Sequence, residues 1–302
     1  MTTAPVPRTN SAAVALVLAS VLWGTTGTAA SFLPSNVSPL AIGASTMALG
    51  GLLLFATSAR RALAAIREPA ARRWLLIGAI GVFVYPLAFY AGMNQAGVAI
   101  GNVVALGSGP VFAAILEWLW ERHRLSVLWL VCTVVAIAGI VLLMIGGHRE
   151  SGATGSVPLG VGLGLIAGLA YALYTYASSR AIGTGQPPSA VMGGMFGFGA
   201  VLLIPVLLTL GAPLLQSTQS VGIAAYLAIG PMFVAYLLFG IGMRTMRSST
   251  ATTITLIEPL VATLLAVLVV GERLEVVGWI GLLLILAGVT VLATARQPGN
   301  SR

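Results

Sequence analysis

The sequence predicts an all-α, polytopic membrane protein with ten transmembrane helices, built as two inverted five-helix repeats. Three observations lead to this fold class: the composition, the spacing of apolar runs and an internal repeat. Of the 302 residues, 58% are hydrophobic and only 7% are charged, whereas a soluble domain carries about a quarter charged residues. The mean hydropathy is +1.01. A chain with so little polar surface must be solvated by lipid.

Ten apolar runs are long enough to cross a membrane, because a hydrocarbon core of about 30 Å needs roughly 20 helical residues. The predicted helices occupy residues 12–31, 38–58, 73–94, 98–118, 126–145, 157–180, 188–210, 221–243, 250–270 and 275–294. The segment Arg60–Arg67 is predicted to form a short helix on the membrane surface. The first run ends at Gly27–Ser31, which resembles a signal-peptide cleavage site. We expect this helix to be retained, because the internal repeat requires it.

The arginines predict the orientation of the chain. All 15 basic residues are arginines, and cytoplasmic loops are rich in basic residues. With both termini in the cytoplasm, the cytoplasmic segments hold 13 of the 15, and only Arg149 and Arg273 fall outside. This reading explains the net charge of +8 without nucleic acid. The expected partners are the lipid bilayer and a small-molecule substrate, and a monomer is the working expectation.

The internal repeat emerges when the chain is aligned with itself at an offset of 149 residues. This offset superimposes Pro110 on Pro259, Arg124–Leu125 on Arg273–Leu274, and Gly139 on Gly288. The two halves are then residues 12–145 and 157–294. Because five is odd, the second half enters the membrane from the opposite side. Inverted repeats of this kind build secondary transporters, with the substrate site near the midplane where the halves meet.

Glu258 is the first candidate for that site. It precedes Pro259 about eight residues into the ninth run, roughly 12 Å along the helix axis. A carboxylate at that depth costs about 2.5 to 3.5 kcal/mol on insertion scales. It either binds a proton that drives transport, pairs with a substrate amino group, or serves a structural role as a protonated side chain bonded to carbonyls that Pro259 frees. The sequence leaves these readings open.

The other candidates are aromatic and polar side chains within the spans, and a second proline. Aromatic rings at depth line a pocket for a flat ring or a cation, or else pack the core. The predicted substrate-binding residues are Trp23, Tyr85, Phe89, Asn102, Ser108, Tyr171, Tyr174, Tyr236 and Glu258, and the predicted helix breaks are Pro110 and Pro259. Glu117 is expected to extend to the cytoplasmic cluster 121–124. The glycines of 160–168 have the small-xxx-small spacing that brings helices close.

No enzyme, metal site or cofactor is expected. The chain has no Asp, and His123 and His148 lie at a span end and in a loop. The single cysteine, Cys132, lies in an apolar run, where it is expected to pack. A catalytic Ser–His pair, Asp pair or metal cluster at depth is therefore missing. No basic residue lies within a span interior, which disfavours phosphorylated substrates and favours neutral, zwitterionic or cationic solutes.

The chain resembles the EamA-type branch of the drug/metabolite transporter superfamily. The resemblance rests on the two halves, on Trp23–Gly24 and Glu258–Pro259, and on Gly271–Leu274 between the last two spans. The first half departs from the pattern, because Arg122–Leu125 stands where Gly-Glu-Arg-Leu is expected. Among subfamilies, the chain is most similar to bacterial exporters of aromatic amino acids of the YddG type. This resemblance implies a basket-like ten-helix bundle, a central cavity and alternating access in the bacterial inner membrane.

Two transport functions remain open. The first is export of amino acids, aromatic or large neutral ones, and of related metabolites. The alternative is a proton-coupled efflux pump for cationic drugs that uses Glu258. Replacing Glu258 by Gln separates them, because a proton-coupled pump needs the carboxylate, whereas an amino-acid facilitator keeps part of its flux.

Overall fold

A computed structural model of the chain describes residues 9–96, 98–122, 125–146, 156–270 and 275–294. Within these ranges the regular elements are all helical, and no strand occurs. Seven helical segments of the described chain are long and apolar enough to cross a membrane, and two shorter apolar helices cover Val127–Leu142 and Val276–Leu292. These findings confirm an all-helical, polytopic membrane protein. The arrangement of ten spans in two inverted repeats stays a prediction.

Helices lie at each predicted position and end within a few residues of the predicted limits, α2 excepted. The predicted first half contains α1 (Thr9–Ala30), α2 (Pro39–Arg67), α3 (Pro69–Ala96), α4 (Val98–Glu121) and α5 (Val127–Gly146). The second contains α6 (Val157–Gly183), α7 (Pro188–Leu210), η1 (Ala212–Leu215), α8 (Thr218–Leu227), η2 (Ala228–Val234), α9 (Ala235–Gly242), α10 (Ser248–Ile254), α11 (Ile257–Leu265), η3 (Ala266–Val270) and α12 (Val276–Thr294).

The predicted surface helix at Arg60–Arg67 is wrong, because this segment continues α2 without interruption. Ala62 and Ala65 are fully buried on the inner face of the extension. The helix ends only where Pro69 follows Glu68, and a residue before proline is disfavoured in the α conformation. The sequence suggested a break because the apolar run ends near Ser58, but helix continuity depends on packing and propensity as well as on apolarity.

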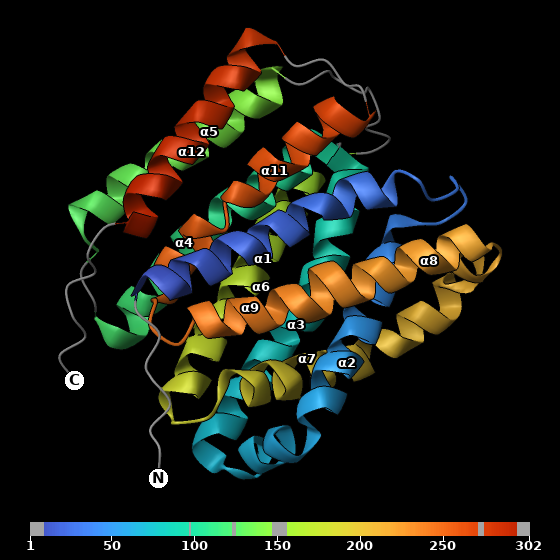
Figure 1. The fold of residues 1–302 in the computed structure, drawn as a ribbon, viewed down its shortest axis with the longest axis vertical. Coiled ribbons are helices and arrows are strands. Elements are labelled where there is room, and N and C mark those ends of the chain that lie inside the picture. Colours follow the sequence, from blue (N-terminus) through green and yellow to red (C-terminus); the bar gives the residue numbers. More distant parts are fainter. Residues whose placement is uncertain (1–8, 97, 123–124, 147–155, 271–274, 295–302) are drawn as a thin grey trace.

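Helices from the two halves lie side by side in pairs. α3 packs along α6, α2 along α7, and α5 along α12, and the last pair stands at one edge of the molecule in Figure 1. Small residues permit these close contacts. A Cβ atom at Gly81 would lie 2.7 Å from the Ala170 carbonyl oxygen, and one at Gly139 would lie 2.6 Å from that of Gly281. At these positions the backbones of the two halves therefore lie in close contact.

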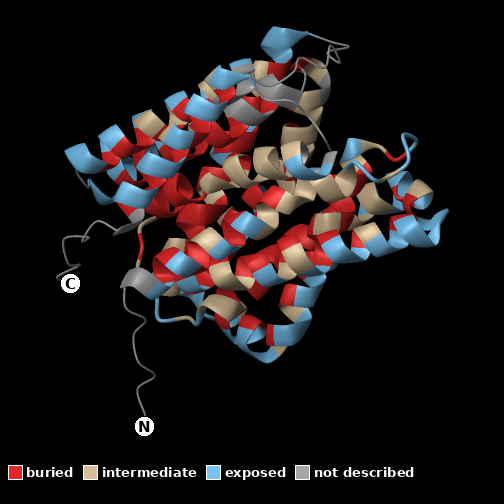
Figure 2. Ribbon diagram, turned by 45° about the horizontal axis from the view of Figure 1, so that its top comes forward, coloured by how far each residue is buried: buried red, intermediate tan, exposed pale blue. Residues whose placement is uncertain are grey.

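The outer surface of the bundle is apolar. Figure 2 shows buried residues gathered between the helices and exposed ones on the outward faces. The exposed residues include many large hydrophobic ones, and Leu208 and Leu268 are 77% and 78% exposed. Such a surface is unstable in water but suits a hydrocarbon environment.

The two ends of the bundle differ in their chemistry. At one end the start of α3 meets the ends of α4 and α6, where Arg180 pairs with Glu121 at 3.0 Å. We call this the arginine-rich end, since Arg72, Arg73, Arg122, Arg180 and Arg244 lie there. At the opposite end, polar contacts between neutral side chains join the helices, such as Asn36 Nδ2 to Gln216 Oε1 at 2.9 Å. The arginine distribution predicts that the arginine-rich end is cytoplasmic.

Candidate functional site

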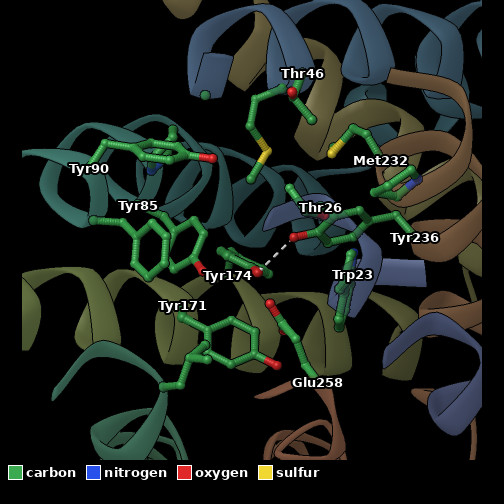
Figure 3. A pocket seen from close by; sticks show the side chains of 16 residues that line it. Trp23, Thr26, Thr46, Tyr85, Tyr90, Tyr171, Tyr174, Met232, Tyr236 and Glu258 are labelled. Atoms are coloured by element: carbon green, nitrogen blue, oxygen red, sulfur yellow. Dashed lines mark hydrogen bonds between the residues drawn. The ribbon is translucent and has the colours of Figure 1, made fainter. Parts of the chain in front are cut away.

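A cavity of about 100 Å³ lies between helices of both halves (Figure 3). Its walls come from α1, α2, α3, α4, α6, η2, α9 and α11. The lining residues are Trp23, Thr26, Gly43, Thr46, Met47, Tyr85, Pro86, Phe89, Tyr90, Leu106, Tyr171, Tyr174, Pro231, Met232, Tyr236 and Glu258. Seven of the nine predicted substrate-binding residues are among them. Seven of the sixteen lining residues are aromatic, one is a carboxylate and none is basic.

Aromatic rings form a continuous wall of the cavity. Tyr85 and Phe89 stack with centroids 5.4 Å apart, as their spacing of four residues along a helix predicts. Tyr171 lies 5.9 Å from Tyr85, and on the other side Trp23 lies 5.0 Å from Tyr236. Such a wall offers flat faces to an aromatic ring and negative ring faces to a cation.

The buried tyrosines bond to one another and to the broken helix. Tyr174 OH and Tyr236 OH lie 2.9 Å apart and join α6 to α9, the bond drawn in Figure 3. Tyr171 OH lies 2.6 Å from Thr255 Oγ1, at the junction of α10 and α11. A hydroxyl buried in an apolar bundle needs such a partner. These bonds hold the aromatic wall in one arrangement.

Glu258 lies in the first turn of α11 and points into the space between Tyr171 and Trp23 (Figure 3). The helix is interrupted just before it, at Thr255–Leu256. Pro259 explains the position of the break, because it has no N–H for the Thr255 carbonyl four residues earlier. Instead, the Glu258 N–H donates to that carbonyl at 3.0 Å.

Gly24 explains why Trp23 lies next to Glu258. A Cβ atom at position 24 would lie 2.6 Å from Val261 Cβ and 3.0 Å from the Glu258 carbonyl oxygen. Only glycine therefore lets α1 approach α11 this closely. The Trp23–Gly24 pair thus combines a cavity-lining ring with the contact that places it.

The predicted break at Pro110 is wrong, because α4 is continuous from Val98 to Glu121. Transmembrane helices tolerate proline where neighbouring helices support them. Pro110 still removes the helical donor from the carbonyl of Leu106, and Leu106 lines the cavity. Proline therefore interrupts the helix in α10–α11 and leaves it intact in α4.

Two predicted site residues are not among the cavity lining. Ser108 Oγ donates to the Ala105 carbonyl oxygen at 3.3 Å and faces Gly168 of α6, where it supports helix packing. Asn102 belongs to α4, but its side chain lies outside the described residues. The Arg124–Leu125 and Arg273–Leu274 pairs of the repeat also fall partly or wholly outside the described ranges.

Nine of the lining residues were not predicted from the sequence. Among them is Thr46, whose buried Oγ1 has no hydrogen-bond partner within the described chain. Tyr90 reaches the cavity because Gly43 of α2 leaves room for its ring. Met232 comes from η2, a π-helical turn that contains Pro231. The signal available in the sequence was Pro231, which interrupts an apolar run. It lies in this irregular turn, and π-helical turns are frequent at functional sites.

The cavity approaches the end opposite to the arginines. At this opposite end α2 begins and α3 ends. Gly43 lies one turn from the start of α2, and Tyr90 lies less than two turns from the end of α3. Toward the arginine-rich end, Phe196 and Phe239 are fully buried beside the Tyr174–Tyr236 pair. The structure is therefore filled with side chains on the arginine-rich side of the cavity.

Glu117 does not extend to the membrane surface as expected. It is only 3% exposed and accepts hydrogen bonds from the start of α10. Its neighbour one turn on, Glu121, is the residue at the surface, where Tyr176 OH and Arg180 donate to it. Sequence spacing alone did not distinguish these two carboxylates, because it carries no information on which face α10 covers.

In the described part of the chain, no three His, Cys, Asp or Glu side chains lie together. Cys132 is buried in α5, 4% exposed, beside Leu292 of α12. Of the glycines of 160–168, those spaced four residues apart make the predicted close contacts, since Gly160 meets Ala96, Gly164 meets Val104 and Gly168 meets Ala105. Gly162 meets no atom within 4 Å.

Comparison with known proteins supports a role in membrane transport rather than catalysis. The chain is 32% identical over 286 residues to Uncharacterized transporter YwfM of Bacillus subtilis (strain 168), covering 93% of both chains. It is 25% identical over 285 residues to Uncharacterized inner membrane transporter YicL of Salmonella typhimurium (strain LT2), covering 92% of this chain and 93% of the relative.

A solved crystal structure has the same fold. It has a TM-score of 0.76 and 23% identity, and the match covers 93% of this chain and 96% of the other. The sequence profile named EamA-like transporter family matches residues 10–145 and again residues 158–294. Nearly the whole chain is thus accounted for by one profile, and the chain belongs to the EamA-like transporter family.

Proposed function

We propose that this protein is a secondary transporter that exports amino acids, aromatic or large neutral ones, and related metabolites, as the YddG type does. The observation that carries the proposal is the cavity, which combines aromatic faces with the carboxylate of Glu258 between the halves. Glu258 offers a partner for a substrate ammonium group, and the rings offer a flat apolar surface for its side chain. The proposed working unit is a monomer.

The proposed architecture is ten spans in two inverted repeats, residues 12–145 and 157–294. The contacts of α5 with α12 support it. A Cβ atom at Gly139 would meet the Gly281 carbonyl oxygen, and one at Gly288 would meet that of Cys132. At the repeat offset of 149 residues, Gly139 becomes Gly288 and Cys132 becomes Gly281. The two contacts therefore exchange under the repeat, as expected of a two-fold axis between the halves.

The proposed mode of transport is alternating access in a bacterial inner membrane, with both termini in the cytoplasm. Helices of the first half pack against helices of the second half. In the proposed mode, bodies on the two sides of these contacts move against each other. The relatives are named transporters, and the Salmonella protein is named an inner membrane transporter.

A second candidate is proton-coupled efflux of cationic drugs. The observation that favours it is the charge of the lining, which has one carboxylate and no basic residue to receive a substrate carboxylate. Glu258 and the surrounding rings resemble the aromatic sites that bind organic cations.

Transport by the purified full-length protein in liposomes distinguishes the two candidates. For the first, we expect uptake of labelled tryptophan or phenylalanine above that of threonine, with part of the flux kept in Glu258→Gln. For the second, we expect efflux of a cationic dye that needs a pH gradient and is abolished in Glu258→Gln. Glu275→Gln is the matched control, because Glu275 is exposed outside the bundle and should leave transport unchanged. Transport of none of these compounds would contradict both candidates.

A further inference from the structure

Among the carboxylates of the described residues, Glu117 accepts the most hydrogen bonds. Its Oε1 accepts from Ser248 Oγ at 2.6 Å and from the backbone N–H of Ser249 at 2.9 Å. Its Oε2 accepts from Ser249 Oγ at 2.7 Å. Hydrogen bonds to a charged group are shorter and stronger than neutral ones. The two serines therefore satisfy a carboxylate that is nearly removed from solvent.

This contact crosses the boundary between the two halves. Glu117 belongs to α4 of the first half, whereas Ser248 and Ser249 begin α10 of the second. It lies at the arginine-rich end, one helical turn before Glu121, and therefore on the side of the cavity where the structure is filled. If the cavity is to open toward this end, α4 and α10 must separate here.

Helix α10 connects this contact to the cavity. All seven of its residues, Ser248–Ile254, are buried, so the helix is held on every side. Thr253 Oγ1 lies 3.0 Å from Thr133 Oγ1 of α5, and Thr255 Oγ1 bonds to Tyr171 OH. The segment then continues into α11, which carries Glu258. A movement of α10 is thus transmitted to the cavity wall.

We propose that Glu117 is the latch that holds the arginine-rich end shut. The latch consists of the Glu117 carboxylate and the Ser248 and Ser249 donors, closed in the structure described and released when the cavity opens to that end. Separation leaves a buried carboxylate without partners until water enters, which favours the closed arrangement. The proposal rests on the alternating access of the proposed function. It adds the contact that sets the balance between the state closed at the arginine-rich end and the state open there.

The test measures accessibility at the closed end and needs no substrate. Cys132→Ser removes the only cysteine of the chain, and Met246→Cys then introduces a probe that is 4% exposed among the side chains filling this end. We expect Glu117→Gln to raise the rate of maleimide labelling at position 246 at least fivefold in liposomes. Ser248→Ala combined with Ser249→Ala should act in the same direction, because it removes the two hydroxyl donors.

Glu121→Gln is the matched control. Glu121 lies on the same helix and also crosses to the second half, but its side chain is 34% exposed and the Arg180 pair is accessible to water. An exposed pair contributes little, so labelling should change less than twofold. Thermal melting of each variant in detergent separates an opened end from a misfolded protein.

Unchanged labelling in both folded latch variants would overturn the proposal, and so would an equal rise in Glu121→Gln. If the protein transports none of the tested solutes but labelling rises as expected, the proposed substrates fail and the latch stands. If transport proceeds and labelling does not rise, the latch alone fails.

Discussion

Two carboxylates decide the chemistry of the bundle at the residue scale. Glu258 faces a cavity with aromatic walls, whereas Glu117 is bonded to three donors at the end of the bundle. Burial of a charge is tolerated only with partners or with access to water and ligand. Glu117 has the first and Glu258 the second. In the two proposals made above, the same residue type therefore serves closure at one place and substrate recognition at the other.

Thr46→Val tests the role of the cavity's unsatisfied hydroxyl. The Oγ1 of Thr46 has no bonding partner among the described residues, so its loss should not destabilise the protein, and Tm should stay equal or rise. Affinity for a polar substrate should fall by roughly fivefold, about the effect of one hydrogen bond near 1 kcal/mol. Thermal melting and transport assays measure the two effects.

Ser45→Ala supplies the comparison for Thr46. Ser45 is buried next in sequence, but its hydroxyl donates to the Ile42 carbonyl at 3.0 Å within the helix and does not line the cavity. This variant should leave substrate affinity unchanged. A drop in Tm with unchanged affinity for Thr46→Val would show that the hydroxyl supports the fold and not the ligand.

At the scale of elements, α6 shows how glycine places a helix. A Cβ atom at Gly168 would overlap Ser108 Oγ and lie 2.8 Å from the Ala105 carbonyl oxygen, so α6 and α4 must separate to admit it. Gly168→Ala should therefore destabilise the protein by about 1 to 3 kcal/mol, the usual range for overpacking. A lowered Tm in detergent is the expected measurement.

Gly162→Ala is the control on the same helix. No atom lies within 4 Å of a Cβ built at Gly162, and alanine is the better helix former by about 1 kcal/mol. Tm should stay constant or rise. If both alanine variants behave alike, the close packing of α4 on α6 is not what Gly168 provides.

At the scale of the whole molecule, the orientation can be measured with single cysteines. Two variants are made in the Cys132→Ser background, Arg244→Cys and Ser35→Cys. Position 244 is exposed at the arginine-rich end, and position 35 is exposed at the opposite end. An impermeant maleimide applied to intact cells should label position 35 and leave position 244 unlabelled. Labelling of both positions from outside would contradict the inverted arrangement, and labelling of position 244 alone would reverse the orientation.

Most helix positions followed from the sequence because each span had to satisfy its own backbone in lipid. The limits of α6, α7 and α12 therefore lie close to the ends of their apolar runs. The lining of the cavity was predicted in part for a related reason: Glu258 and the tyrosines stand out at membrane depth, where polar groups are costly. α2 was misjudged at its end, and the continuity of α4 through Pro110 depended on its neighbours.

The lipid environment, the helices, the family and seven of the cavity-lining residues could be predicted from the sequence, because the length of an apolar run and a polar residue inside it are both visible locally along the chain. The packing of the helices was needed to show that Thr46 and Tyr90 line the cavity, that Ser108 packs against Gly168, and that Glu117 bonds to α10. These facts depend on which faces of distant helices meet. Contacts between helices in lipid follow backbone proximity and single polar pairs, and no periodicity along one chain specifies the partner.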